Sequence, residues 1–249
     1  MSGHSKWATI KHQKGAKDAK RGKLFAKLAR QIEVTARAGG PDPASNAALR
    51  TAVLKAKAGQ MTNDAIDRAI KRGAGTDEGG TYEAITYEGY APGGVAMMVD
   101  ALTDNRNRTG ANIRTIFSKL GGSMAEPGAV GWQFSRKGVI IVDGAVDEDE
   151  LTMAALDADA DDVARDGDDW RVLCAPNHVY DLQAALEAAG IAVKSAESTM
   201  VSSIDVEVTA LADAKKILRI MDALEDDDDV QDVYSNFDIS EELMEMAGE

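Results

Sequence analysis

Cysteine and long apolar runs are scarce in this chain of 249 residues, and each scarcity excludes a class of protein. Cys174 is the single cysteine, so neither an internal disulfide nor a thiolate zinc site can form, which suits a reducing cytoplasm. The longest apolar stretch, residues 91–99, is far shorter than the roughly 20 residues that span a bilayer. Residues 1–23 are polar and basic, without the apolar segment of a signal peptide. We therefore expect a cytoplasmic protein that does not use a membrane.

Negative charge predominates, with a net charge of −14, but it is unevenly distributed. Residues 1–73 hold 16 basic and 5 acidic residues, a net charge of +11. The remaining 176 residues hold 12 basic and 37 acidic residues, a net charge of −25. Such asymmetry predicts an anionic partner for the basic part, usually nucleic acid or a membrane surface. A membrane helix is the weaker reading here, because a small helical domain would use the apolar face as its core.

Three helices are predicted in the basic part. In residues 18–38 the apolar side chains fall on one face of a helix and the cationic ones on the opposite face. The second helix is predicted to begin with Asp42 as its N-cap and Pro43 in its first turn. The third is predicted to follow the cap Thr62 and to end before Gly73. Residues 73–80 have the composition of a flexible linker.

Beyond residue 80 the pattern changes to strands that alternate with helices. Residues 139–201 have the order βαββαβ, a ferredoxin-like arrangement. The strand–helix–strand piece in residues 204–237 cannot form a full sheet alone, so we expect it to join residues 81–134, which end in a predicted strand at 131–134. The predicted fold class is multi-domain α+β, with a three-helix domain (1–75) and two ferredoxin-like βαββαβ-type domains, one discontinuous (76–135 plus 203–249) and one acidic and inserted in it (136–202). Three domains in series are the alternative.

Several motifs resemble the YebC/PmpR family, most closely in the first 135 residues. They are Met1-Ser2-Gly3-His4-Ser5-Lys6-Trp7, Ile10-Lys11-His12, Lys20-Arg21-Gly22-Lys23, Tyr87-Glu88-Gly89-Tyr90-Ala91-Pro92-Gly93-Gly94-Val95 and Thr103-Asp104-Asn105-Arg106-Asn107-Arg108-Thr109. The resemblance implies a helical domain plus two αβ domains and no enzymatic activity. It also implies nucleic acid as the partner: members are commonly called DNA-binding transcriptional regulators, while relatives include a mitochondrial translational activator of cytochrome oxidase and bacterial proteins linked to the ribosome. The inserted domain departs from the family pattern by its many aspartates.

Basic residues recur every three or four positions along the N-terminal arm and the first helix, which favours repeated contacts with phosphate groups. The arm also carries side chains that can stack on unpaired bases. The alternative interpretation is a helix face that is merely solvated. The basic residues of the arm are not balanced by glutamates, which argues against this alternative. The predicted nucleic-acid contacts are His4, Lys6, Trp7, Lys11, His12, Lys14, Lys17, Lys20, Arg21, Lys23, Lys27 and Arg30, together with Arg106 and Arg108 in the loop before a predicted helix.

Other residue patterns carry structural readings. In residues 104–109 the alternative to phosphate binding is helix capping by Asp104, Asn107 or Thr109. The turn at residues 89–94 is expected to be geometric, since its glycines suit a tight connection between strands. Cys174 and His178 are four residues apart but lie across an expected turn, so we predict no thiol–imidazole pair.

No catalytic residue, metal site or cofactor is predicted. The aspartates in residues 157–168 lack the glycine and the final glutamate of a calcium loop. Two arm histidines have no third metal ligand nearby. The predicted function is a non-enzymatic regulator of gene expression that binds nucleic acid. The sequence favours neither DNA nor RNA as the target. The alternative is a translation factor that associates with the ribosome or with rRNA. A protein-interaction scaffold, whose basic domain docks on acidic surfaces, is the further alternative. A monomer is the simplest expectation for the oligomeric state.

Overall fold

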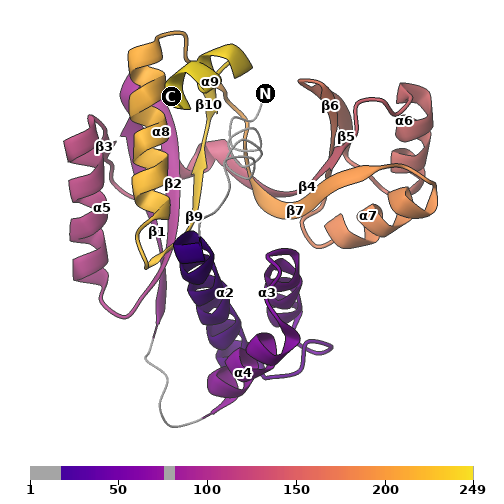
Figure 1. Cartoon of the computed structure of the whole chain (residues 1–249), viewed down its shortest axis with the longest axis horizontal. Helices are drawn as coiled ribbons and strands as arrows, with labels where there is room; N and C mark the ends of the chain where they lie inside the picture. The colour runs from indigo at the N-terminus through magenta and orange to yellow at the C-terminus, as the bar shows by residue number, and fades with distance from the viewer. Residues whose placement is uncertain (1–17, 76–81, 249) are drawn as a thin grey trace.

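The structure is a computed structural model that describes residues 18–75 and 82–248. Its buried apolar residues form one cluster in the helical part, one in residues 87–244 and one in residues 140–191, with a smaller cluster between the last two. We call the surrounding parts the helical unit (18–75), the split unit (82–135 and 203–248) and the inserted unit (136–202). Figure 1 shows them as three lobes, with the helical unit below the other two. We propose that they correspond to the three predicted domains; most of the predicted linker lies outside the described residues.

The helical unit consists of α2 (Asp18–Gly39), α3 (Ala47–Ala58) and α4 (Asn63–Ala74). The predicted apolar face of the first helix is confirmed, because Leu28 and Ile32 are buried against α3 and α4. Thr62 caps α4 as predicted and accepts a hydrogen bond from Ala65 N. Unlike the prediction, α4 continues through Gly73, where a Cβ atom would lie 2.4 Å from the carbonyl oxygen of Glu33. A glycine is therefore needed inside α4 for close packing rather than to end it.

The prediction that Asp42 caps the second helix is wrong. Residues 42–45 form a turn in which Asp42 accepts a hydrogen bond from Ala44 N, and α3 begins after Asn46. Asn46 accepts from Leu49 N and donates to the carbonyl groups of Thr35 and Gly40. This side chain satisfies groups at the end of α2 and the start of α3 at once, which an aspartate without N–H donors cannot do.

The first half of the split unit contains β1 (Glu83–Ala91), β2 (Val95–Thr103), α5 (Arg106–Leu120) and β3 (Ser123–Met124). Its second half follows the inserted unit and contains β8 (Val206–Glu207), α8 (Leu211–Glu225), β9 (Val230–Ser235), β10 (Phe237–Asp238) and α9 (Glu241–Gly248). The predicted joining of the two halves occurs in one sheet of order β3-β1-β2-β9. Strands β1 and β2 form a hairpin ahead of α5, and its tight turn has φ near 80° at Gly93 and Gly94, as expected for a geometric role.

The inserted unit contains all but the first two residues of β4 (Phe134–Val142), together with α6 (Glu148–Asp157), β5 (Asp162–Asp166), β6 (Asp169–Cys174), α7 (Val179–Ala188) and β7 (Val193–Ser202). The sheet order β5-β6-β4-β7 with antiparallel pairing is that of a ferredoxin-like βαββαβ unit, which confirms the prediction for this segment.

The strand predicted at residues 131–134 is wrong, because Gly131–Gln133 is the 3₁₀ turn η2 and β4 begins at Phe134. The Glu88 carboxylate accepts hydrogen bonds from the backbone N–H groups of Gly128, Val130 and Gly131. Those donors are consequently unable to join a strand ladder. Within the described ranges, no helix is long and apolar enough to cross a membrane.

Candidate nucleic-acid interface

The predicted contact residues of the arm lie outside the described residues. They are His4, Lys6, Trp7, Lys11, His12, Lys14 and Lys17. Lys20 lies in the first turn of α2. The structure therefore locates the side chains of Arg21, Lys23, Lys27 and Arg30 on α2, and of Arg106 and Arg108 at the start of α5.

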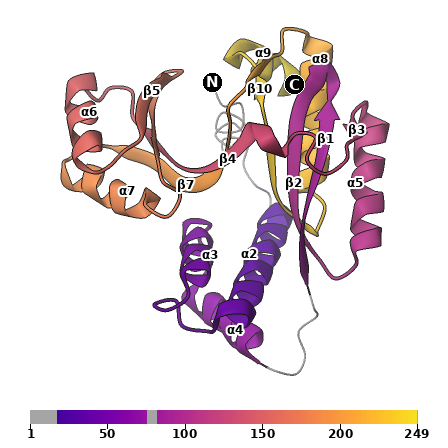
Figure 2. The same ribbon diagram turned by 180° about the vertical axis from the view of Figure 1, so that it is seen from behind.

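The cationic face of α2 reaches the segment at the C-terminal end of α8, which we call the acidic loop (residues 225–229, sequence EDDDD) and which begins with the last residue of α8. Lys23 Nζ donates to the carbonyl oxygen of Asp226 at 3.1 Å, and Lys27 Nζ donates to that of Glu225 at 2.5 Å. In Figures 1 and 2 the upper part of α2 meets the split unit where α8 turns into β9. The carbonyl groups at the C-terminus of a helix carry partial negative charge. The approach of two α2 lysines to the C-terminal end of α8 is therefore electrostatically favourable.

Arg30 extends this contact into the split unit. Its Nη1 donates to the carbonyl oxygens of Leu102 and Asp228 at 3.1 and 3.0 Å, and to Asp229 Oδ1 at 3.1 Å. The guanidinium also lies 4.9 Å from the ring centroid of Tyr82, within the range of a cation–π contact. One arginine thus links α2 to β2, to the acidic loop and to the residue before β1.

Asp229 is the junction of these contacts and is only 5% exposed. Its second carboxylate oxygen accepts from Arg108 Nη2 at 2.7 Å and from Thr109 Oγ1 at 2.7 Å. Burial by itself raises the pKa of Asp229, but the hydrogen bonds from Arg108 and Thr109 and the charges of Arg108 and Arg30 outweigh it. The pKa therefore lies below its ordinary value, and the carboxylate is ionised at neutral pH.

Arg106 and Arg108 are largely neutralised by acidic neighbours. Arg108 pairs with Asp104 at 2.8 Å as well as with Asp229, and Arg106 lies 3.4 Å from the carboxylate of Glu83. The helix cap is Asn105, whose side chain accepts from Arg108 N, and not one of the three predicted caps. The structure therefore brings Arg30 and Arg108 together on one carboxylate, while Arg106 points elsewhere.

Arg21 differs from Lys23, Lys27 and Arg30 because no contact joins it to the acidic loop. Its guanidinium lies 5.3 Å from the ring centroid of Phe25, and the residue is exposed. Arg21 is thus a predicted contact residue that is presented to solvent away from the acidic loop.

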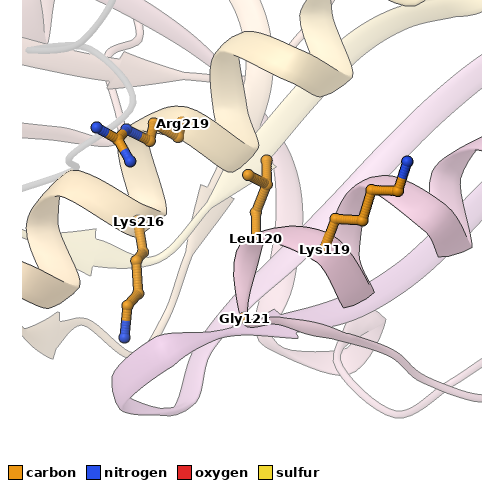
Figure 3. Close-up of a pocket in the computed structure, with 5 residues that line it drawn as sticks. All are labelled: Lys119, Leu120, Gly121, Lys216 and Arg219. Carbon is orange, nitrogen blue, oxygen red and sulfur yellow. The ribbon is translucent and has the colours of Figure 1, made fainter.

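Two groups of cations were missed by sequence reasoning. Lys55 on α3 pairs with Asp232 on β9 at 2.7 Å, a contact across 177 residues that no local pattern predicts. A second group surrounds a hollow of about 290 Å³ between α5 and α8, and it comprises Lys119, Lys216 and Arg219 (Figure 3). A signal for this group was present, because α5 contains four basic residues and no acidic one.

The remaining chemical candidates have structural roles. Burial raises the pKa of the Cys174 thiol to about 11, so the thiol is protonated at neutral pH. His178 Nε2 lies 3.1 Å from the carbonyl oxygen of Ala158 instead of approaching that thiol. In residues 18–75 and 82–248, no group of three or more His, Cys, Asp or Glu side chains is placed to hold a metal ion.

Comparisons with known proteins agree along the whole chain. The profile of the TACO1/YebC protein N-terminal domain matches residues 5–76, and that of the TACO1/YebC second and third domain matches residues 82–237. A probable transcriptional regulatory protein of Rubrobacter xylanophilus is 57% identical over 100% of both chains. Another, from Geobacter sp. strain M21, is 50% identical over 98% of this chain and 99% of its own.

A solved structure has the same fold. The crystal structure of a conserved hypothetical protein from Aquifex aeolicus superposes with a TM-score of 0.77 at 44% identity, covering 90% of this chain and 93% of that one. The multi-domain α+β architecture is therefore shared with a homologue. Together with the two matching profiles, these similarities show that the chain belongs to the TACO1/YebC family.

Proposed function

We propose that this chain is a non-enzymatic, cytoplasmic regulator of gene expression that binds nucleic acid through residues 4–37. The observation that carries the proposal is the charge division, +11 in residues 1–73 against −25 in the rest of the chain. A polyanion is attracted to the first part and repelled by the second, which orients the protein on its target. The printed name of the Rubrobacter xylanophilus and Geobacter relatives, probable transcriptional regulatory protein, supports a regulatory role.

The helical unit supports this proposal beyond the arm. Exposed cations are distributed over all three of its helices, so its positive potential is not confined to the face that meets the acidic loop. They are Arg21, Lys23, Arg37, Arg50, Lys57, Arg68, Lys71 and Arg72. Lys23 donates to a backbone carbonyl group of the acidic loop, whereas Arg108 is paired with two carboxylates. A phosphate group can therefore share Lys23 with the acidic loop.

DNA and ribosomal RNA are both compatible with a phosphate-directed contact. Co-sedimentation of the full chain with ribosomes, and retention on genomic DNA, compared at low and moderate salt in one lysate, separates the two. Association with ribosomes that resists moderate salt supports the translation-factor alternative, and retention on DNA alone supports transcriptional regulation. Absence from both fractions at low salt contradicts the proposal, because counterion release makes binding strongest there.

A second candidate function is a protein-interaction scaffold whose basic unit docks on acidic surfaces. The contacts of Lys23, Lys27 and Arg30 with the acidic loop favour it, because they are a docking of this kind within one chain. Small-angle scattering of the free protein tests the idea. Expansion in high salt, where exposed ion pairs are screened, supports a releasable docking, whereas a radius of gyration independent of salt counts against it.

A further inference from the structure

All Lys and Arg residues of the split unit lie on two neighbouring helices. The unit holds 19 acidic and 7 basic residues in residues 82–135 and 203–248, and the basic ones are confined to α5 and α8. These helices are in contact on the same side of the sheet, and Ile113, Phe117 and Ile217 belong to the apolar cluster that they share. An acidic unit thus carries a localised positive surface, separate from the helical unit.

The centre of this surface is the group Lys119, Lys216 and Arg219, which we call the α5–α8 patch. Its members line one hollow of about 290 Å³ together with Leu120 and Gly121. Gly121 ends α5 in the left-handed conformation, with φ of 91°, and turns the chain away from the hollow toward β3. In Figure 3 the three charged ends lie around the rim and point in different directions, instead of converging on one point.

The cations of the patch are poorly neutralised, in contrast to those at the other end of α5. Among the described residues, neither Lys119 nor Arg219 has a hydrogen-bond or ion-pair partner for its charged end, and Lys216 reaches Asp213 only at 3.9 Å. Arg106 and Arg108 are each paired with carboxylates at 3.4 Å or less. Like charges gathered with few counter-charges raise the local positive potential, which attracts anions.

A solvated helix face is the ordinary explanation for exposed lysines, and complementing the helix dipole explains Lys119 in the last turn of α5. Neither accounts for Lys216 and Arg219, which lie in the interior of α8, at the same hollow. Three of the split unit's seven cations meet at this hollow, and a binding role explains that clustering.

We propose that the α5–α8 patch is a second contact for the sugar–phosphate backbone of the nucleic acid, an inference that rests on the function proposed above. Charges spread around a rim suit successive phosphates of an extended strand better than a single phosphate ion. The patch lies at the C-terminal end of α5, whereas Arg108 near the acidic loop lies at its N-terminal end. The helix has 15 residues and is therefore about 22 Å long. A nucleic acid that follows α5 from its end near the acidic loop to the patch covers up to this length, about six base pairs at 3.4 Å each.

The test compares two full-length double variants of equal charge change. K119Q/R219Q removes two cations of the patch, and K137Q/K194Q removes two cations of the inserted unit, one partly exposed and one exposed, whose ion pairs contribute little to stability. Affinities of both variants and the wild type are measured at several salt concentrations, with a duplex DNA of about 30 base pairs and with an RNA hairpin of similar length. We expect the patch variant to lower the slope of log K against log salt by about 1.8 on DNA and the control variant to leave it unchanged.

The two proposals fail in different ways. If the wild type binds neither probe at low salt, the proposed function is wrong and the patch has no nucleic acid to contact. If the wild type binds but both double variants keep its slope, the second contact is wrong and the first stands. Polyglutamate serves as an anion without phosphate: if K119Q/R219Q weakens its binding but leaves the nucleic-acid slope intact, the patch binds acidic proteins, which also overturns the inference.

Discussion

Removal of residues 1–17 is expected to lower the affinity of the chain for nucleic acid about 10³-fold at 0.1 M salt. The deleted arm carries Lys6, Lys11, Lys14 and Lys17 and no acidic residue. Each phosphate contact contributes about 0.9 to the slope of log K against log salt, which is nearly one order of magnitude in affinity at this salt concentration. Fluorescence anisotropy with a labelled oligonucleotide measures the change, and the slope should fall by about 3 to 4.

Two full-length variants separate charge from the other properties of the arm. Replacing its four lysines by glutamine should reproduce the loss, and replacing them by arginine should retain the affinity, because arginine keeps the positive charge. Unchanged affinity of the truncated chain would show that the arm does not contribute to binding. A loss in the arginine variant as well would show that something more specific than charge is recognised.

Asp229→Ala is expected to lower the free energy of unfolding by about 2–4 kcal/mol, the largest stability effect that we predict for a surface loop. The carboxylate is nearly buried and accepts charge-assisted hydrogen bonds from Arg30 and Arg108, together with one from Thr109. Its removal leaves the buried Thr109 hydroxyl and the two guanidinium groups without this acceptor, and it removes a tie between α2 and the split unit. Urea denaturation at neutral pH measures the loss.

Asp228→Ala is the matched control, because it removes the same charge from the same loop. Its side chain is exposed, and Arg30 contacts only its backbone carbonyl group, which the substitution leaves in place. We expect a change within about 0.5 kcal/mol for the control. Equal effects of the two substitutions would mean that loop charge, and not the junction at Asp229, determines stability.

The contribution of Asp229 to stability should disappear in acid. Its pKa in the folded chain is lowered from the ordinary 3.8, so the folded state favours the ionised form. The stabilisation is therefore complete above the unfolded pKa of 3.8 and is lost as pH falls through the lower folded value. The difference in unfolding free energy between the wild type and Asp229→Asn should narrow progressively below about pH 4. A difference that stays constant down to pH 2 would be inconsistent with a depressed pKa.

Local patterns in the sequence were sufficient for most elements of the fold. The apolar stripe that contains Leu28 and Ile32 identified the buried face of α2, and the order of strands and helices identified the ferredoxin-like inserted unit. Turn chemistry was a weaker guide. Asp42 and Pro43 are a valid helix start by composition, but Asn46 forms three hydrogen bonds at this junction and determines where α3 begins.

The candidate site was less predictable because its contacts join residues far apart in the chain. Lys23, Lys27 and Arg30 form a cationic face in any helical projection, and nothing local indicates that they meet carbonyl groups about 200 residues later. The role of Asp229 likewise depends on the joining of the two halves of the split unit. The α5–α8 patch was within reach, since the absence of acidic residues from α5 is visible in the sequence. The prediction of residues 4–37 as the binding segment stays a prediction.

Photocrosslinking of the full chain to a bound nucleic acid, followed by mass spectrometry of the linked peptides, tests this central claim most directly. Binding through the arm and α2 predicts crosslinks concentrated in residues 4–37, with Trp7 and Arg21 among the linked positions. Crosslinks confined to the inserted unit would contradict the account, because that unit should repel a polyanion.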